Sequence, residues 1–457
     1  MKTYDAIVIG SGQGGVPLAI DFAKLGWRVA LIEEGQLGGS CINYGCTPTK
    51  TMIASARIAH AAKRGPEFGV HTGNVRVDMA EIVARKNEIS GSFRSGIEDQ
   101  VKNNPNLTLY RGHGRFTAPH EIEVNGEKLS SDRIFINTGT RPRILPIPGL
   151  DQVAYLTNRN IMDLKQVPAH LIALGGNYLG LEFGQLFRRL GSEVTVVELA
   201  DQIIPREDAE VGQSLKDALE EEGMNFRLGA RTTKIAKTPD GLEVTIEKKD
   251  GTAETLRGSH LLVSIGQTPN SDELGLDEAG IETDQAGFIR HNGKLETNVP
   301  GVWVIGDVKG GPAFTHVSYD DYLVIKDNLV NGKDRTIDNR VVPYALYTDP
   351  ELGRIGLSER EARAKGHRLK IGSAPMAYVA RAIERGETKG LMKIVINADN
   401  DRILGATILG PEGGELVQIL MALMMANAPW TLFKNAMFIH PTLAEGFFAL
   451  MASVEAA

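Results

Sequence analysis

Cysteine is nearly absent from this sequence. The chain holds two cysteines among its 457 residues, Cys41 and Cys46, and they stand five positions apart. Two cysteines cannot build the disulfide framework of a small secreted protein. Without a neighbouring histidine they also fall short of the four ligands of a structural zinc site. A close pair of this kind favours redox chemistry.

The sequence also lacks long apolar runs and an excess of basic residues. No stretch approaches the roughly 20 apolar residues of a membrane-spanning helix, and the formal net charge is −7. That charge argues against nucleic acid or an anionic membrane as a partner. The first residues, Met1-Lys2-Thr3-Tyr4-Asp5, lack the features of a signal peptide. We therefore expect a soluble, cytoplasmic protein that acts on small molecules.

Glycine, by contrast, is abundant, with 51 residues, and its placement discloses an internal repeat. An apolar strand at 6–9 leads into a glycine-rich turn at 10–15, a helical pattern, and a second strand that ends in Glu33. The same order recurs 165 residues later, at 171–174, 175–180, 194–197 and Glu198.

Each glycine of this repeat has a purpose in a dinucleotide site. The first permits the tight strand-to-helix turn, the second lets the backbone approach a pyrophosphate, and the third lets helix pack on strand. The helix N-terminus offers N–H groups to the phosphates, and the acid that ends the second strand accepts hydrogen bonds from ribose. We predict two dinucleotide sites, formed by Gly10, Gly12, Gly15 and Glu33, and by Gly175, Gly180 and Glu198.

The second copy departs from the pattern at Asn177, which replaces the middle glycine. Asparagine tolerates a positive φ better than most residues. We therefore expect the turn to survive, with a less close approach to the pyrophosphate. Two sites imply two dinucleotides, one held permanently and one exchanging.

The spacing of the two cysteines restricts the backbone between them. In a regular helix, residues five apart are separated by roughly 140° around the axis and about 7.5 Å along it. A disulfide requires Cα atoms within about 7 Å. We expect the pair to close on a loop or a distorted helix start, for which Gly45 supplies the freedom. Two unpaired buried thiols remain the alternative.

The run that holds both cysteines resembles the flavoprotein disulfide reductases, the family of glutathione reductase, lipoamide dehydrogenase and mercuric reductase. The resemblance covers essentially the whole chain. It implies that Cys41 exchanges with substrate and that Cys46 lies against the flavin as a thiolate. It also implies that Lys50 sits near the flavin with Glu182 as its ion-pair partner, and that Tyr178 shields the flavin until the nicotinamide arrives.

Three further stretches carry the same resemblance. The strand and turn at Gly139 resemble the point where the chain leaves the FAD domain. The run that ends at Asp307 resembles the second FAD fingerprint, whose aspartate binds the ribitol chain. The turn at Gly266 resembles the exit from the NAD domain.

A histidine and a glutamate near the C-terminus, His440 and Glu445, stand in a His-Pro-Thr-x-x-Glu run. Taken alone, they indicate a helix cap and a solvated acid. The resemblance implies instead a pair that reaches across a dimer interface into the partner's disulfide site. There, imidazole would shuttle a proton near pH 7 and Glu445 would orient the ring. The resemblance therefore predicts a homodimer whose monomer is inactive.

The predicted fold class is α/β, with two Rossmann-like dinucleotide-binding domains, for FAD and NAD, and a C-terminal α/β dimerisation domain. The cofactors are FAD and NAD(H). NADP(H) is less favoured because Glu198 would repel a 2′-phosphate and the nearest arginine, Arg206, lies eight residues on. We place a first FAD part at 1–150, the NAD(P) domain at 151–270, a second FAD part at 271–337 and the dimerisation domain at 338–457.

These motifs do not specify the substrate. A disulfide or dithiol, in a reaction like that of lipoamide dehydrogenase, fits the proton shuttle at His440. A metal-ion reductase is the first alternative, since the runs 38–50 and 314–322 look more like mercuric reductases. Those enzymes usually carry a second cysteine pair at the C-terminus, suited to soft metal ions, and this chain has no third cysteine. A catalytically silent flavoprotein scaffold is the alternative from another class, against which the complete set of candidate catalytic residues argues.

Overall fold

A computed structural model describes all 457 residues. The fold contains two five-stranded parallel sheets, and the first repeat forms one of them. The strands pair in the order β19-β8-β2-β3-β4. Four of them come from the first third of the chain, whereas β19 lies beyond the second repeat, so the chain leaves this sheet and returns to it. The bounds are β2 (Ala6–Ile9), β3 (Val29–Glu33), β4 (Leu107–Arg111), β8 (Ile134–Ile136) and β19 (Val302–Val304).

The second repeat forms the other parallel sheet, in the order β10-β17-β11-β12-β13. Both sheets contain short, nearly continuous apolar strands, as expected when both faces of a parallel sheet are covered. The helix of the second repeat, α5 (Tyr178–Leu190), ends at Gly191 in the left-handed conformation with φ +118°. The strands are β10 (Tyr155–Leu156), β11 (His170–Leu174), β12 (Glu193–Val197), β13 (Met224–Arg227) and β17 (His260–Val263).

The C-terminal part is a six-stranded sheet in the order β20-β21-β24-β23-β22-β25. All of its pairings are antiparallel. Its strands are β20 (Tyr344–Leu346), β21 (Glu351–Gly356), β22 (Leu369–Pro375), β23 (Leu391–Asn397), β24 (Ile403–Gly410) and β25 (Glu455–Ala456).

Smaller sheets and the helices complete the fold. The remaining strands are β1 (Lys2–Thr3), β5 (Gly114–Ala118), β6 (Glu121–Val124), β7 (Glu127–Ser130), β9 (Thr140–Pro142), β14 (Ala230–Thr238), β15 (Gly241–Lys248), β16 (Ala253–Gly258) and β18 (Gln267–Pro269). The other helices are α1 (Gly15–Lys24), α2 (Gly39–Asn43), α3 (Cys46–Arg64), α4 (Met79–Lys102), α6 (Ala209–Glu221), α7 (Leu276–Ala279), α8 (Thr315–Leu329), α9 (Glu359–Ala364), α10 (Ala380–Glu384), α11 (Gly413–Met425), α12 (Trp430–Lys434) and α13 (Phe447–Ala452). No helix has the length and apolar character needed to cross a membrane.

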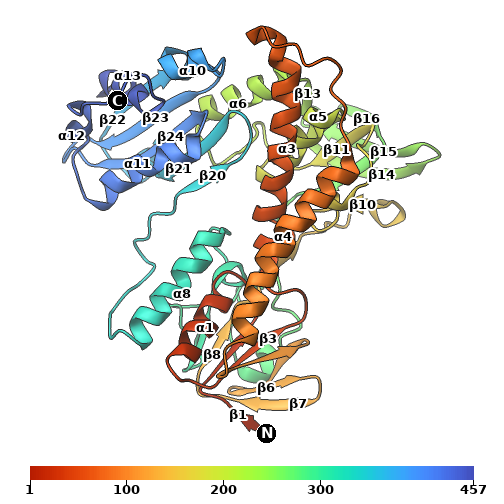
Figure 1. The fold of residues 1–457 in the computed structure, drawn as a ribbon, viewed down its shortest axis with the longest axis vertical. Helices are drawn as coiled ribbons and strands as arrows, with labels where there is room; N and C mark the ends of the chain where they lie inside the picture. Colours follow the sequence, from red (N-terminus) through yellow and green to blue (C-terminus); the bar gives the residue numbers. More distant parts are fainter.

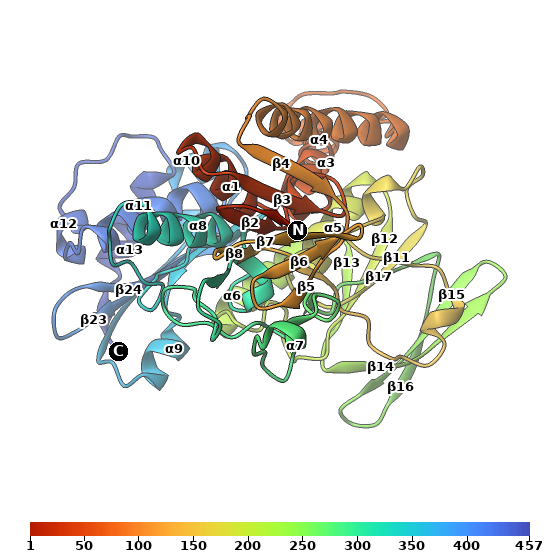
Figure 2. The same cartoon turned by 90° about the horizontal axis from the view of Figure 1, so that it is seen from below.

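The three sheets occupy separate parts of the molecule. In Figure 1 the first sheet lies at the bottom with α1 and α8, the second lies at the right, and the C-terminal sheet lies at the upper left. The long helices α3 and α4 run between them. Figure 2, from below, shows β14, β15 and β16 projecting at the edge of the second part.

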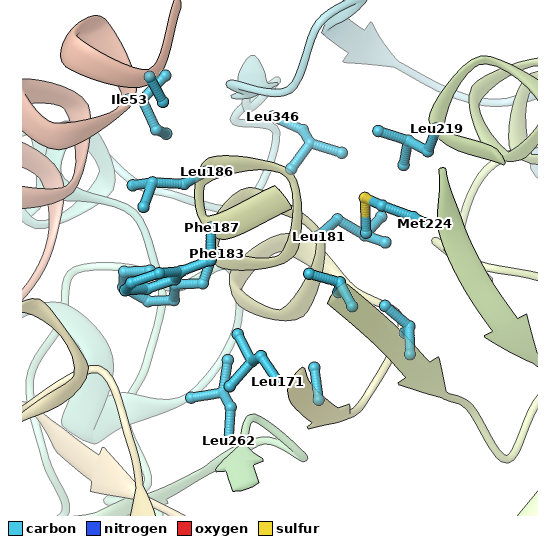
Figure 3. Packing of buried hydrophobic residues seen from close by; sticks show 14 of the residues in the cluster. Ile53, Leu171, Leu181, Phe183, Leu186, Phe187, Leu219, Met224, Leu262 and Leu346 are labelled. Atoms are coloured by element: carbon cyan, nitrogen blue, oxygen red, sulfur yellow. The ribbon is translucent and has the colours of Figure 1, made fainter. Parts of the chain in front are cut away.

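A buried apolar cluster holds α5 in place among these parts. Phe183 and Phe187 of α5 pack in a cluster that also contains Ile53 of α3 and Leu346 of β20. Figure 3 shows side chains of α5 at its centre, with those of neighbouring elements around them. Because interiors are close-packed, the start of α5 is fixed relative to both α3 and the C-terminal sheet.

The predicted fold class is confirmed, with one correction in the second repeat. Asn177 has φ −112° and ψ −169°, which is extended backbone open to any residue. The turn needs a left-handed residue only at Gly175, with φ +105°, so the expectation that Asn177 serves by tolerating a positive φ was wrong. The exact borders of the four segments at 150, 270 and 337 remain a proposal.

Candidate active site

One large cavity runs between the two parallel sheets. Its volume is about 2380 Å³, more than twice the upper end of the roughly 300–1,000 Å³ of ordinary small-molecule pockets. All the predicted site residues line it except Gly15, Gly180, His440 and Glu445. Residues of both glycine-rich turns line this cavity, and its size suits two dinucleotides.

Gly15 and Gly180, the two glycines that do not line the cavity, lie beneath it, where helix meets strand. A Cβ on Gly15 would collide with the carbonyl oxygen of Gly10, and one on Gly180 would collide with that of Gly175. Both positions therefore admit only a hydrogen atom, which is the packing purpose expected of the third glycine.

The acid of each repeat is tied to its own glycine turn. Glu33 Oε2 accepts hydrogen bonds from the backbone N–H of Ser11 at 2.9 Å and from its hydroxyl at 2.6 Å. Glu198 Oε2 accepts from the N–H of Gly176 at 2.6 Å, and its Oε1 accepts from the N–H of Ala200 at 2.8 Å. Both carboxylates are thus fixed at the cavity wall, where they can accept hydrogen bonds from hydroxyl groups of a ligand.

Asn137 clamps the first turn from the neighbouring strand. Its Oδ1 accepts from the N–H of Gly15 at 2.9 Å, and its Nδ2 donates to the carbonyl of Ile305 at 2.9 Å. A Cβ on Gly12 would lie 2.8 Å from the same Oδ1. Asn137 lies two residues before Gly139, and nothing in the sequence indicated this role, because its partners lie more than a hundred residues away in either direction.

Two further turns and an aspartate complete the cavity wall. Gly139 and Gly266 both have a positive φ, of +67° and +115°, and flank the paired strands β9 and β18. Asp307 lies in the short helical turn after β19. Burial raises the pKa of Asp307 to about 6, and the charge of Lys309 opposes the shift. A half-buried carboxylate at a cavity wall suits a ligand that donates hydroxyl hydrogen bonds.

The cysteine pair occupies a break between two helices. Cys41 lies in α2, and Cys46 begins α3 after Tyr44 and Gly45 interrupt the helix. Gly45 has φ −130° and ψ −116°, a conformation outside the regular regions. The expected distorted helix start is thus present, and both cysteines are thiols in this structure.

The two thiols differ in acidity. A hydrogen bond from Cys41 lowers the pKa of Cys46 to about 6; burial opposes this, while Thr315 and the charge of Lys50 add to it. The same hydrogen bond, with burial, raises the pKa of Cys41. Cys46 Sγ lies 3.2 Å from Thr315 Oγ1. These opposite shifts favour the thiolate at Cys46 and the protonated thiol at Cys41.

Lys50, one turn further along α3, forms the expected ion pair. Its Nζ lies 2.7 Å from Glu182 Oε2 and 4.6 Å from the centre of the Tyr347 ring. The other carboxylate oxygen, Glu182 Oε1, accepts from the N–H of Tyr347 at 2.9 Å. Burial lowers the pKa of Lys50, but Glu182 outweighs it and the net shift is upward. The ammonium therefore stays charged beside the cavity.

His440 and Glu445 stand apart from this cavity, on the C-terminal part. His440 Nδ1 lies 2.8 Å from Glu445 Oε2, and the side chains are 73% and 14% exposed. Glu445 Oε1 is buried without a hydrogen-bond partner. The Glu445 carboxylate thus orients the His440 ring, most of which is exposed. The structure does not bring this pair to Cys41 of its own subunit.

Three carboxylates elsewhere form the one cluster that resembles a metal site, namely Asp208, Glu210 and Glu359. The ammonium of Lys393 already occupies their centre. Its Nζ lies 3.0 Å from Asp208 Oδ2 and 2.7 Å from Glu359 Oε2, and it also pairs with Glu210. This cluster is an internal ion-pair network that joins the second sheet to the C-terminal part.

Thr315 and Tyr347 are site residues that sequence reasoning missed. Thr315 contacts Cys46 from a helix 269 positions away, and Tyr347 holds Glu182 from 165 positions away. Neither contact has a local spacing that could disclose it. Thr315 lies in the run 314–322, whose likeness to mercuric reductases indicated no role for this residue.

Comparison with known proteins matches the chain over nearly its whole length. Residues 4–321 match the family described as pyridine nucleotide-disulphide oxidoreductase, and residues 342–450 match the dimerisation domain of that family. Dihydrolipoyl dehydrogenase of Thermus scotoductus is 37% identical and covers 100% of this chain, with 98% of its own length matched. A mercuric reductase of Lysinibacillus sphaericus is 34% identical over 91% of this chain and 76% of its own length.

A solved structure also matches nearly the whole chain. The HOCl-induced flavoprotein disulfide reductase RclA of Escherichia coli superimposes with a TM-score of 0.89 at 32% identity, covering 98% of this chain and 99% of RclA. A Cu(II) complex of RclA superimposes with the same TM-score at 31% identity.

Proposed function

Because this chain belongs to the pyridine nucleotide-disulphide oxidoreductases, a family of FAD- and NAD(H)-dependent enzymes, we propose that it reduces a small disulfide through Cys41 and Cys46. The observation that carries this choice of substrate is His440, an outward-facing imidazole oriented by Glu445 at 2.8 Å. A thiol product needs a proton donor when it leaves, whereas reduction of a metal ion does not.

The residues around the cavity fit both cofactors. FAD would be held by Gly10, Gly12, Glu33, Gly139 and Asp307, with Gly15 packed beneath the turn, and NAD(H) by Gly175, Tyr178, Glu198 and Gly266, with Gly180 packed beneath the turn. Bound FAD would supply the chemistry that takes a hydride from NADH and delivers an electron pair to the cysteine disulfide. Tyr178 would shield the flavin until the nicotinamide arrives, and the Lys50–Glu182 pair would keep a positive charge beside it.

The exchange steps follow from the unequal thiols. Cys41 has a raised pKa, so it needs a base before it can attack. The partner's His440 accepts its proton, Cys41 attacks one sulfur of the substrate, and the departing thiolate takes the proton from the imidazole. Cys46, already a thiolate, then attacks Cys41, which restores the Cys41–Cys46 disulfide. The second product thiolate leaves and takes a proton supplied from solvent through the same imidazole, so NADH, one proton and the disulfide give NAD⁺ and two thiols.

A heterodimer experiment tests the site across subunits. One subunit carries Cys41→Ser and the other carries His440→Ala, with different affinity tags so that the mixed dimer can be isolated. If the partner's His440 serves each cysteine pair, one of the two sites is intact and the mixed dimer keeps about half of the wild-type disulfide turnover. Each homodimeric variant should be inactive.

Two outcomes would contradict the proposal. A mixed dimer as inactive as either homodimer would place His440 in the same subunit as the cysteine it serves. Full activity in the His440→Ala homodimer would remove the histidine from the reaction. FAD absorbance of every dimer provides the control that the cofactor site has folded.

Reduction of a metal ion is the second candidate function, favoured by the similarity to RclA, of which a Cu(II) complex is known. The two thiols are soft ligands suited to such ions. NADH oxidation should be measured with lipoamide, glutathione disulfide, Cu(II) and Hg(II). Turnover on a metal ion that exceeds turnover on every disulfide, and that persists in His440→Ala, would favour this candidate.

A further inference from the structure

Four aromatic rings form a wall beside the N-terminus of α5. Phe314 stacks on His316 with ring centres 5.3 Å apart and on Tyr344 with centres 5.5 Å apart, and both pairs are nearly parallel. Tyr178 packs against the edges of this stack, 5.9 Å from Tyr344 and 6.2 Å from Phe314. Tyr178, Phe314 and His316 line the cavity, whereas Tyr344 lies behind them.

Tyr344 is anchored by a buried ion pair. Its hydroxyl donates to Glu207 Oε1 at 2.5 Å, and Arg354 Nη1 donates to Glu207 Oε2 at 2.7 Å. The side chains of Glu207 and Arg354 are 0% and 2% exposed. A charge-assisted bond to a desolvated carboxylate is strong and directional, so the Tyr344 ring has little freedom to move.

The anchor comes from three parts of the chain. Glu207 precedes α6 in the second sheet's domain, Arg354 lies in β21, and Tyr344 begins β20. Next to Tyr344, the carbonyl of Pro343 lies 2.7 Å from His316 Nε2. The position of the wall is therefore set by the C-terminal part, at the point where that part meets the nicotinamide side of the cavity.

We infer that Tyr344 is a positioning residue for nicotinamide entry, which fixes the resting place of Tyr178 through the aromatic wall. The inference rests on the proposed role of Tyr178 as the shield of the flavin. Burial and the charge of Glu207 raise the pKa of Tyr178 to about 12. The charge of the anchor therefore acts on Tyr178 itself. Tyr344 itself touches no ligand site and acts through its neighbours.

The variant Tyr344→Phe tests this directly, because it keeps the ring and removes only the hydroxyl that bonds Glu207. Two measurements on the FAD-loaded enzyme are needed: the anaerobic rate of flavin reduction by NADH, and quenching of flavin fluorescence by iodide. Misplacement by about 1 Å can cost up to roughly 100-fold in rate. We expect reduction to slow about 10-fold, because a Tyr178 ring without a fixed resting place no longer packs correctly against the arriving nicotinamide. Iodide quenching should increase, since a loosened Tyr178 covers the flavin for less of the time.

A double-mutant cycle separates positioning from a general effect on the fold. Because Tyr344 acts through Tyr178, adding Tyr344→Phe to Tyr178→Ala should change neither measurement further. Tyr322→Phe is the matched control. It also removes a buried tyrosine hydroxyl, one that donates to Asp21 at 3.1 Å, and it should leave both measurements unchanged.

The contrary outcomes are distinguishable. If Tyr178→Ala changes neither measurement, the shielding role itself is wrong and the role of Tyr344 falls with it. If Tyr178→Ala changes both while Tyr344→Phe changes neither, or if the two effects add, the shield stands and only the role of Tyr344 is overturned.

Discussion

Thr315 Oγ1 lies 3.2 Å from Cys46 Sγ although 269 positions separate the two residues. Each residue is the first of its helix, α8 and α3 respectively, so two helix N-termini converge on one sulfur. Helix N-termini carry partial positive charge and favour anions, and this arrangement is known to lower the pKa of cysteine. The contact adds to the hydrogen bond from Cys41, which has the larger effect, in lowering the pKa of Cys46.

Thr315→Val should therefore shift the titration of Cys46. In the two-electron-reduced wild type, the long-wavelength absorbance of a thiolate beside FAD should be present above about pH 6 and fade below it, because the pKa of Cys46 is lowered to about 6. A hydrogen bond to a charged group contributes roughly 1.5–3 kcal/mol, so its loss should raise the midpoint by about one to two pH units.

The matched control for this titration is Thr51→Val. Thr51 lies on the same helix, and its hydroxyl donates to the backbone carbonyl of Thr47 rather than to a thiol. An unchanged midpoint in Thr315→Val, or an equal shift in Thr51→Val, would show that the threonine hydroxyl does not stabilise the thiolate.

Separate serine substitutions should assign the two cysteines. Cys46→Ser should abolish the long-wavelength band, whereas Cys41→Ser should keep it, and neither variant should turn over a disulfide because exchange requires both sulfurs. The spectra of the reduced enzymes, recorded anaerobically, check this. Disulfide turnover in both variants would rule out the proposed electron path.

His440→Ala should separate the two half-reactions. We expect disulfide turnover to fall by roughly 10²–10⁴-fold, the range for loss of a general acid–base. Reduction of the flavin by NADH should remain nearly intact, because His440 does not line the cavity of its own subunit. Stopped-flow measurement of each half-reaction gives the test, and an equal loss in both would indicate a structural defect instead.

Glu198→Ser should weaken the preference for NADH. Both carboxylate oxygens are fixed by backbone N–H groups, so the charge lies in a set place to accept ribose hydroxyls and repel a 2′-phosphate. A hydrogen bond to a charged group contributes roughly 1.5–3 kcal/mol, so its loss should lower kcat/KM for NADH by about 10- to 100-fold. The kcat/KM values of the wild type with NADH and with NADPH should be measured first. A higher value with NADPH would assign phosphate binding to a cation such as Arg206, which also lines the cavity.

The resemblance to flavoprotein disulfide reductases is confirmed at the level of the family, and the fold class with it. The glycine turns could be predicted from residue types alone because a strand–turn–helix unit is specified within a few dozen neighbouring residues. Lys50 and Glu182 were different. Their pairing, 132 positions apart, was available only through the resemblance, since no periodicity connects residues on two separate helices.

The sequence by itself determined the two nucleotide units, the redox pair and the break between the cysteines. Each depends on local backbone geometry that Gly10, Gly175 and Gly45 can adopt because they carry no Cβ. The resemblance implied that Cys46 is the thiolate, but the physical basis appears only in the tertiary structure, because Thr315 reaches Cys46 from a distant helix and solvation depends on everything packed around the site. The same holds for the Tyr344–Glu207–Arg354 anchor, whose three members meet only after separate parts of the chain have packed and excluded water.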